Sequence, residues 1–293
     1  MGLGEWFDGF CKNIAVKDGG TISARYRLLT KRLNTEFWNT DSESSHSLYI
    51  GSYGRNTAIS GFSDLDMSFE LPSSIYKQYD QHAGNGQSAL LQALKNAIAK
   101  TYSTSSVGGD GQVVVTSFTD GLTFEILPAF VNNTGGYNYP NANSGGSWKS
   151  TNPKAEMAAF SQRNKDSNYN LVLLCRMMRS WKAKWDVPIS GMLIDTLAYQ
   201  FIEGWQYRDK SYYFYDYMCR DFFRYMADQN DKQTYWRAPG SADYVATKGN
   251  FQYKATRCHN ISLEAIQYEQ AKPSKEWSAK DKWRDIFGTA FPD

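Results

Sequence analysis

Two carboxylates with metal-binding spacing, Asp64 and Asp66, lie in the second half of the stretch 47–71. Polar and apolar residues alternate from Asp64 to Leu71, which is the pattern of a half-buried β-strand. Side chains two residues apart on a strand point the same way and lie roughly 6.5–7 Å apart. Two carboxylates so placed can bind divalent ions, and Mg²⁺ prefers oxygen ligands and phosphates. The pair therefore predicts a metal site.

The first half of the stretch has features of a phosphate site. Leu48, Tyr49 and Ile50 predict a short strand that ends at Gly51-Ser52. A strand followed by a Gly-Ser turn and a helix start presents unpaired backbone N–H groups to an anion. Alone, either half is as well explained by a turn or a solvated strand face. Together, and in this order, they favour a polyphosphate site.

The sequence G-S-Y-G-R-N-T-A-I-S-G-F-S-D-L-D resembles the G-S-x-x-R-x-T…D-x-D signature of the DNA polymerase β-like nucleotidyltransferases. It is most similar to the bacterial cGAS/DncV-like branch (CD-NTases of the SMODS type), which makes cyclic oligonucleotide signals in anti-phage (CBASS) defence. The resemblance implies a two-lobed α+β fold with a mixed, mostly antiparallel sheet and a C-terminal helical lobe. It also implies that Gly51, Ser52 and Arg55 bind the nucleotide.

A third carboxylate, Glu125, lies in the second strand of a predicted pair, Gln112–Phe118 and Leu122–Val131, which a D-G turn separates. A carboxylate among apolar neighbours needs a cation beside it, unless the strand is an exposed edge. The family has Asp in a D-x-x-P-A context here, and this chain has Glu in its place. The resemblance thus implies that Asp64, Asp66 and Glu125 hold two Mg²⁺ ions, for which Mn²⁺ could substitute.

Composition excludes several classes of protein. The 293 residues can form two lobes, and no apolar run is long enough to cross a membrane. The N-terminus is unlike a signal peptide, so we expect a bacterial cytoplasmic protein with no membrane partner. Four dispersed cysteines argue against a disulfide framework or a zinc ribbon.

Charge is unevenly distributed. Up to Trp148 there are 13 acidic and 10 basic residues, and from Lys149 onward there are 17 acidic and 22 basic residues. An acidic, metal-binding lobe and a more basic lobe suit a polyphosphate ligand. A duplex-DNA binder would need a concentrated basic stripe, so we expect no stable nucleic-acid partner.

Periodicity divides the chain into residues 1–150, a catalytic lobe with an N-terminal spine helix, and residues 151–293, a helical lobe. Apolar spacing predicts helices over 20–38 and Ser88–Tyr102. A Gly-rich break is expected at 108–111. The stretch 131–152, rich in turn formers, is expected to be a long loop joining the lobes.

In the helical lobe, residues 168–185 form a predicted helix with an apolar stripe from Leu171 to Trp185, and its cations lie on other faces. By resemblance, Arg179 contacts the triphosphate, with Lys182 as the alternative. Ser190 is the predicted N-cap of the next helix, and the family has a hydroxyl near the phosphates there.

The leading hypothesis is a template-independent nucleotidyltransferase that joins NTPs into a cyclic di- or trinucleotide and releases pyrophosphate. ATP, GTP or both are the expected substrates, with a pyrimidine NTP as an alternative. A monomer is expected, and an effector would respond to the product. Two alternatives stay open, namely an enzyme that transfers a nucleotide to a protein, tRNA or small molecule, and a degenerate nucleotide-binding module. All three carboxylate positions are occupied, which favours catalysis.

Overall fold

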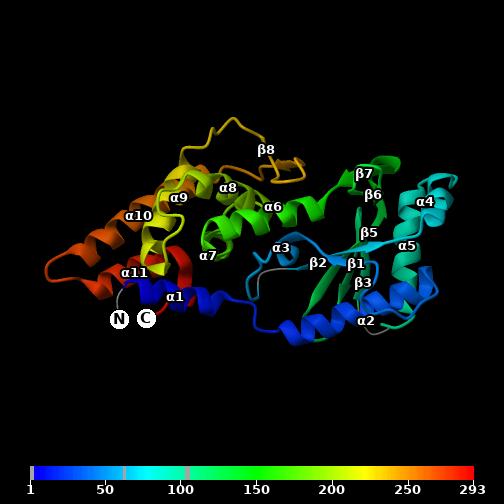
Figure 1. The fold of residues 1–293 in the computed structure, drawn as a ribbon, viewed down its shortest axis with the longest axis horizontal. Helices are drawn as coiled ribbons and strands as arrows, with labels where there is room; N and C mark the ends of the chain where they lie inside the picture. Colours follow the sequence, from blue (N-terminus) through cyan, green and yellow to red (C-terminus); the bar gives the residue numbers. More distant parts are fainter. Residues whose placement is uncertain (1–2, 62–63, 103–105) are drawn as a thin grey trace. The chain divides into compact units, whose positions relative to one another are not determined.

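A computed structural model describes residues 3–61, 64–102 and 106–293. The chain forms two compact units (Figure 1). The helical unit contains Met1–Val16, Arg55–Phe62 and Glu156–Asp293, and the sheet unit contains Lys17–Gly54 and Ser63–Ala155. The chain passes from the sheet unit to the helical unit for the last time between Ala155 and Glu156, whereas the predicted division was at residues 150/151. Residues 3–16 and 55–61, which were predicted to lie in the catalytic lobe, group with the helical unit.

The sheet unit contains one mixed sheet, in which seven described strands take part. The central order is β1-β2-β5-β4-β3, and β6 pairs with both β5 and β7. Only β2 and β5 run parallel among these pairs. The strands are β1 (Ser47–Tyr49), β2 (Leu65–Glu70), β3 (Ser106–Asp110), β4 (Val113–Ser117), β5 (Thr123–Val131), β6 (Tyr137–Asn141) and β7 (Ser147–Thr151). The expected mixed, mostly antiparallel sheet is confirmed.

Helices of the same unit pack against this sheet. Helix α5 packs on α2 and α4 and on strands β3, β4 and β6. Its apolar stripe, which includes Leu90, Leu94 and Ile98, is fully buried. The helices are α2 (Gly19–Phe37), α3 (Gly51–Gly54), α4 (Ser73–Asp80) and α5 (Gly86–Ala99). The two helices predicted from periodicity are present, with ends shifted by one to three residues.

The stretch 131–152 is not the predicted loop. Strands β6 and β7 form a hairpin that extends the sheet from the end of β5, with Tyr137 opposite Thr151. Turn formers such as Asn138 and Pro140 lie within the strands, and the turn between the strands contains Gly145 and Gly146, with positive φ angles of 89° and 99°. The Gly-rich break predicted at 108–111 is also wrong, since β3 occupies 106–110 and pairs with β4.

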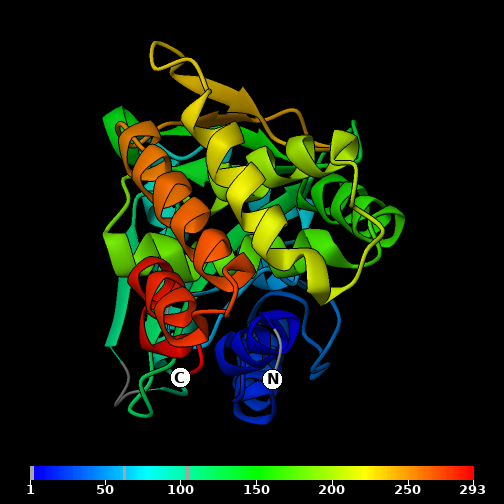
Figure 2. The same cartoon turned by 90° about the vertical axis from the view of Figure 1, so that its left-hand side faces the viewer.

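The helical unit forms a second core. Its helices are α1 (Leu3–Ile14), most of α6 (Pro153–Asp166), α7 (Asn170–Trp185), α8 (Gly191–Gly204), α9 (Tyr215–Ala227), α10 (Gln252–Gln270) and α11 (Glu276–Phe287). A small hairpin joins β8 (Tyr235–Arg237) to β9 (Tyr244–Ala246). Figure 2 shows α10 alongside both α9 and α11, which it contacts. The predicted α7 stripe is buried from Leu171 to Trp181, whereas Trp185 at its end is half-buried.

The two ends of the chain share this core. Phe7 and Phe10 of α1 pack on aromatic rings near the C-terminus, with ring centroids 4.9 Å apart for Phe7 and Trp283 and 4.7 Å apart for Phe10 and Phe287. The four cysteines are buried and free, as expected. Among the described residues, no helix is long and apolar enough to cross a membrane.

Asp216, in the first turn of α9, is a buried acid whose removal we expect to stabilise the protein. It is 3% exposed, and its Oδ1 accepts no hydrogen bond from the described residues. Burial raises the pKa of Asp216 to about 7. In the unfolded chain the carboxyl group ionises with a pKa of about 3.9, whereas in the folded state it stays protonated up to a higher pH. The free energy of unfolding therefore falls as the pH rises from about 4 to 7.

Asp216→Asn mimics the protonated side chain, so it should raise the melting temperature at pH 8 and change it little at pH 4, with a gain of roughly 1–3 kcal/mol at the higher pH. Thermal unfolding between pH 4 and 8.5 measures this. The control is Asp281→Asn on the exposed face of α11. Parallel pH profiles for wild type and Asp216→Asn would contradict the prediction.

Candidate active site

The sheet brings two of the three predicted acids onto neighbouring parallel strands. Asp66 on β2 pairs directly with Glu125 on β5, and Asp64 is the residue just before β2. Strand β5 is an interior strand between β2 and β4. Glu125 is therefore not on an exposed edge, and the alternative that it is a surface residue of an edge strand is wrong.

Chemically, these acids suit a hard divalent cation. Asp64 is exposed, whereas Asp66 and Glu125 are half-buried beside the fully buried Phe124 and Ile126 of the opposite face. Carboxylate oxygens are the ligands that Mg²⁺ and Mn²⁺ prefer. Among the described residues, however, no three His, Cys, Asp or Glu side chains already converge as a metal cage. A bound ion would have to draw these carboxylates together.

Gly51 fits closely against one of these carboxylates. It begins α3 with φ +58°, a conformation that favours glycine. A Cβ atom at Gly51 would overlap the carboxyl group of Asp66. The backbones are joined as well, because Ile50 N donates to Asp66 O at 3.0 Å. The Gly-Ser turn, with Ser52 as its second residue, is thus built around the D-x-D strand.

The segment between the two halves of the motif belongs to the helical unit. Arg176 of α7 donates from Nη2 to Asn56 Oδ1 at 2.7 Å, and Ile59 is 3% exposed in the core of that unit. Ser60 N donates to Ile14 O at 3.0 Å. Phe62 and Ser63 of the motif lie outside the described residues.

A buried charge cluster holds this segment in place. Asp195 of α8, 0% exposed, accepts hydrogen bonds at its Oδ2 from Arg55 Nε (3.1 Å), Arg179 Nη2 (2.7 Å) and Thr57 Oγ1 (2.9 Å). Arg55 Nη1 also donates to Glu156 Oε2 at 3.1 Å. Burial raises the pKa of Glu156, and the Arg55 charge opposes that rise. Such ion pairs compensate the desolvation of buried charges.

Arg55 is enclosed, because only 5% of its side chain is exposed and two carboxylates engage its guanidinium. Its predicted contact with the nucleotide stays a prediction. The periodicity of residues 168–185 also left Arg179 on a solvent face, which is wrong, because its side chain is only 8% exposed. Its predicted contact with a triphosphate stays a prediction.

Ser190 is the N-cap of α8, as predicted, and its Oγ accepts from Leu193 N at 3.1 Å. Lys182 is half-buried in the last turn of α7. Asp195 and Glu156 were missed by the sequence analysis. Asp195 could have been found as the lone acid in the apolar run L-I-D-T-L, because a carboxylate on a core face requires a buried partner.

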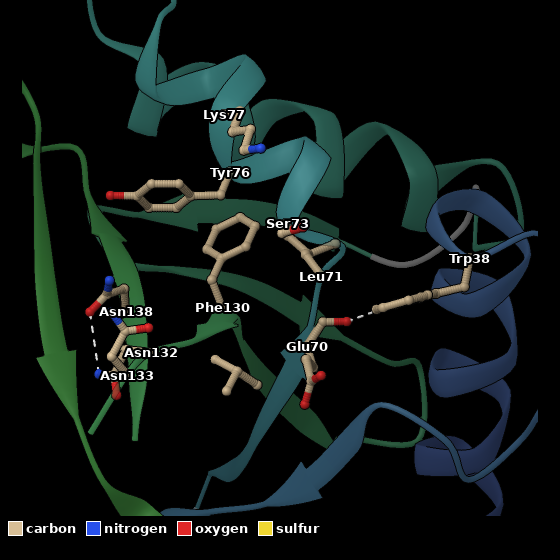
Figure 3. Close-up of a pocket in the computed structure, with 11 residues that line it drawn as sticks. Trp38, Glu70, Leu71, Ser73, Tyr76, Lys77, Phe130, Asn132, Asn133 and Asn138 are labelled. Atoms are coloured by element: carbon tan, nitrogen blue, oxygen red, sulfur yellow. Dashed lines mark hydrogen bonds between the residues drawn. The ribbon is translucent and has the colours of Figure 1, made fainter. Parts of the chain in front are cut away.

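A cavity of about 510 Å³ lies elsewhere in the sheet unit (Figure 3). Its lining includes Glu70 at the end of β2, Phe130 near the end of β5 and Tyr76 of α4. Glu70 is four residues after Asp66, which separates the two by roughly 13 Å along the strand. The three acids are not among the residues that line this cavity.

Gly51→Ala should disturb Asp66 as well as the backbone, and so reduce stability by more than the roughly 1 kcal/mol of positive-φ strain. Gly121→Ala is the matched control in the same unit, since Gly121 has φ +88° but a Cβ added there would have nothing within 4 Å. Chemical denaturation of both variants measures the difference. Equal losses of stability in Gly51→Ala and Gly121→Ala would contradict the close packing of Gly51 against Asp66.

Asp195→Ala should destabilise the protein by about 3–5 kcal/mol, because two buried guanidinium groups would lose their shared carboxylate. The control, Asp228→Ala, removes the acid of an exposed pair with Arg224 on α9 and should change stability little. Urea unfolding gives both values. A small effect at Asp195 would mean that the cluster does not hold the segment 55–62.

The chain is similar to known proteins in both sequence and fold. It is 26% identical to a probable cyclic nucleotide synthase of Bacillus cereus (strain VD146), over 58% of this chain, and spans about half (51%) of that relative's length. Its fold is similar to that of CdnC from E. coli MS115-1, solved in a complex with HORMA-deltaN (TM-score 0.71, 15% identity, 99% of this chain and 98% of that chain).

The fold is also similar to CdnG, a CD-NTase of Bradyrhizobium diazoefficiens (TM-score 0.67, 14% identity, 97% of this chain and 94% of that chain). The DncV cyclic AMP-GMP synthase of Vibrio cholerae matches with TM-score 0.65 and 14% identity, over 84% of this chain and 69% of that chain. Residues 1–164 match the family described as the Second Messenger Oligonucleotide or Dinucleotide Synthetase (SMODS) domain. Because this match covers more than half of the sequence, the chain belongs to the SMODS family.

Proposed function

We propose that the protein is a template-independent nucleotidyltransferase that joins NTPs into a cyclic di- or trinucleotide second messenger in bacterial anti-phage defence. The observation that carries the proposal is the register of β2 and β5, which sets Asp66 beside Glu125. Membership of the SMODS family supports it. We keep the bacterial cytoplasm as the predicted location.

In this proposal Asp64, Asp66 and Glu125 hold two divalent metal ions, Mg²⁺ or Mn²⁺. When bound, such ions lower the pKa of an attacking hydroxyl and neutralise charge on the phosphates. Gly51 and Ser52 orient the β- and γ-phosphates through the tight turn that contacts Asp66. Arg179, Lys182 and Ser190 supply cations and a hydroxyl to the triphosphate from the helical unit.

The reaction forms one P–O bond and breaks another at each step. The 3′-hydroxyl oxygen of one nucleotide attacks the α-phosphorus of an NTP, its proton leaves to solvent, and pyrophosphate departs with the electrons of the broken bond. A second such step between the ends of the linear product closes the ring. Positioning of the two reactants by the protein supplies much of the rate enhancement.

Substrates and partners are inferred from relatives. The structures of CdnC with ATP and of CdnG with GTP support purine NTPs as substrates of this protein. The complex of CdnC with a HORMA protein suggests that a protein partner is worth testing. We keep the prediction of a monomer without a stable nucleic-acid partner for the protein alone.

The test is incubation with labelled NTPs, singly and in pairs, with Mg²⁺ or Mn²⁺. Release of pyrophosphate together with a phosphatase-resistant product, identified by mass, would support a cyclic oligonucleotide. Transfer of a single nucleotide to an added acceptor would instead favour the other kind of nucleotidyltransferase. No turnover with any nucleotide would favour a degenerate binding module.

The double variant Asp64→Asn, Asp66→Asn should reduce turnover by at least about a hundredfold, because it loses two of the proposed carboxylate ligands of the metal ions. The protein should stay folded, since one of the two acids is exposed and loss of both charges reduces repulsion without metal. Steady-state kinetics and thermal unfolding check the two parts. Normal turnover would exclude the metal assignment.

Glu125→Gln should abolish turnover, whereas Glu125→Asp should keep measurable activity with a changed preference between Mg²⁺ and the larger Mn²⁺. The reason is that Gln loses the ligand charge, and Asp only shortens its reach by one methylene. Measuring the turnover of both variants as a function of Mg²⁺ concentration, and then of Mn²⁺ concentration, checks both expectations. Near-normal activity of Glu125→Gln would leave a site of Asp64 and Asp66 alone.

A further inference from the structure

The cavity shown in Figure 3 has no role in the proposed reaction. The described residues that line it all belong to the sheet unit, and they come from the C-cap of α2, the ends of β2 and β5, helix α4 and strand β6. Its volume of about 510 Å³ is within the range of small-molecule sites. We therefore asked which ligand its side chains could recognise.

Hydrogen bonds and ring contacts fix the walls of the cavity. The backbone N of Glu70 donates to His46 O at 2.7 Å, and Glu70 O accepts from Trp38 Nε1 at 2.9 Å. The Trp38 ring stacks on the His46 ring, with centroids 4.0 Å apart and planes 3° apart. The Tyr76 ring packs edge-on against Phe130, with centroids 5.2 Å apart. The cavity is therefore preformed, which lowers the cost of binding a ligand.

The carboxylate of Glu70 is a hydrogen-bond acceptor at one end of the cavity. It is half-buried, yet within the described part of the chain it accepts no hydrogen bond and forms no ion pair within 4.0 Å. Its charge is only the last cause of the raised pKa of Lys154, whose ammonium lies over the Tyr137 ring, 5.2 Å from the centroid. An ionised carboxylate has two acceptor oxygens and no donor, so a ligand at this end should bring donors.

Strand β6 supplies a donor of fixed orientation, Asn138. The Oδ1 of Asn132 accepts from the backbone N–H groups of Thr134 and Gly136, both at 3.0 Å, so its Nδ2 must be the donor of that amide. This Nδ2 donates to Asn138 Oδ1 at 3.4 Å, and Ser150 Oγ donates to the same oxygen at 2.9 Å. The Nδ2 of Asn138 is thereby left as a donor, and no hydrogen bond to another described residue uses it.

Lys77 of α4 supplies a cation. It is exposed and forms no ion pair within 4.0 Å with any described residue. Figure 3 shows Lys77 and Glu70 on opposite sides of Phe130. The lining between the two charges is apolar, since Phe130 and Leu71 are 4% and 3% exposed. The cavity therefore suits an elongated ligand with donors at one end, a flat apolar middle and an anion at the other end.

A guanine nucleotide has this arrangement of groups. The N1–H and N2–H₂ groups of guanine are adjacent donors that match the two oxygens of a carboxylate, and such charge-assisted pairs are the strong ones. Adenine lacks this pair of donors. An amino acid fits less well, because its ammonium and carboxylate groups are attached to the same carbon.

We propose that the cavity binds a guanine nucleotide, with Glu70 on the base, Asn138 on a base acceptor and Lys77 on the phosphate. None of the three candidate metal ligands lines the cavity, so this is a second nucleotide site that needs no metal ion. The choice of guanine comes from the side chains of the cavity and does not depend on the proposed function.

The test is calorimetric binding of GMP, AMP and guanosine to the full chain in EDTA. Wild type should bind GMP at least about tenfold more tightly than AMP. Glu70→Gln should weaken GMP binding about tenfold and remove this preference, because Gln replaces one acceptor oxygen with a donor. Thermal unfolding of this variant should match that of wild type, since the carboxylate has no partner to lose among the described residues.

Lys77→Ala tests the phosphate end of the cavity. It should weaken GMP binding about threefold, as expected for an exposed charge, and leave guanosine binding unchanged. Lys149→Ala on β7 is the matched control, because Lys149 is an exposed lysine of the same unit that does not line the cavity. It should change neither affinity.

The outcome can be separated from that of the proposed function. The double variant Asp64→Asn, Asp66→Asn should bind GMP in EDTA as wild type does, whether or not the protein turns over NTPs. The proposal is wrong if GMP does not bind without a metal ion, if AMP binds equally well, or if Glu70→Gln leaves the affinity for GMP unchanged. Loss of GMP binding in the double variant would also overturn it, because the nucleotide would then occupy the candidate active site.

Discussion

The buried carboxylate of Asp195 is the interaction on which much of the helical unit depends. A fully buried charge is stable only when cations and hydrogen bonds replace its water. Asp195 obtains them from Arg55, Arg179 and Thr57, two of which lie on the segment 55–62. The centre of the nucleotidyltransferase motif is thereby fastened to α7 and α8. The Gly-Ser turn before it and the D-x-D strand after it belong to the sheet unit.

This fastening gives the arginine of the motif a structural role. By resemblance to the nucleotidyltransferases, Gly51, Ser52 and Arg55 were expected to bind the nucleotide. In the structure, Arg55 pairs with Asp195, and Thr57 donates a hydrogen bond to it. A motif can therefore combine two functions, with Gly51 contacting the candidate metal ligand Asp66 and Arg55 holding the chain in place.

Features that depend on local periodicity could be predicted from the sequence. The D-x-D strand, the strand of Glu125 and the α7 stripe were all predicted from alternation or helical spacing. The register that pairs Asp66 with Glu125 comes from the folded sheet. The hairpin 137–151 could not be predicted, because its Asn, Gly and Ser residues are common in loops and its pairing is set by the end of β5.

Ion pairs between helices were the second feature that could not be predicted from the sequence. The pattern of α7 shows which positions carry cations, but it does not show that Asp195, sixteen residues away, would bury Arg179.

The distribution of charge gives the two units different tasks within the proposed reaction. All three candidate metal ligands lie in the sheet unit, and the pairing of β2 with β5 fixes the separation of Asp66 and Glu125. The predicted triphosphate cations, Arg179 and Lys182, lie in the helical unit, both on α7. Rigid strands suit the exact spacing that metal ligands need. Lysines on flexible stems suit phosphates, whose charge is spread over several oxygens and tolerates small shifts. The acids should therefore govern turnover, and the cations should govern how tightly the nucleotide is held.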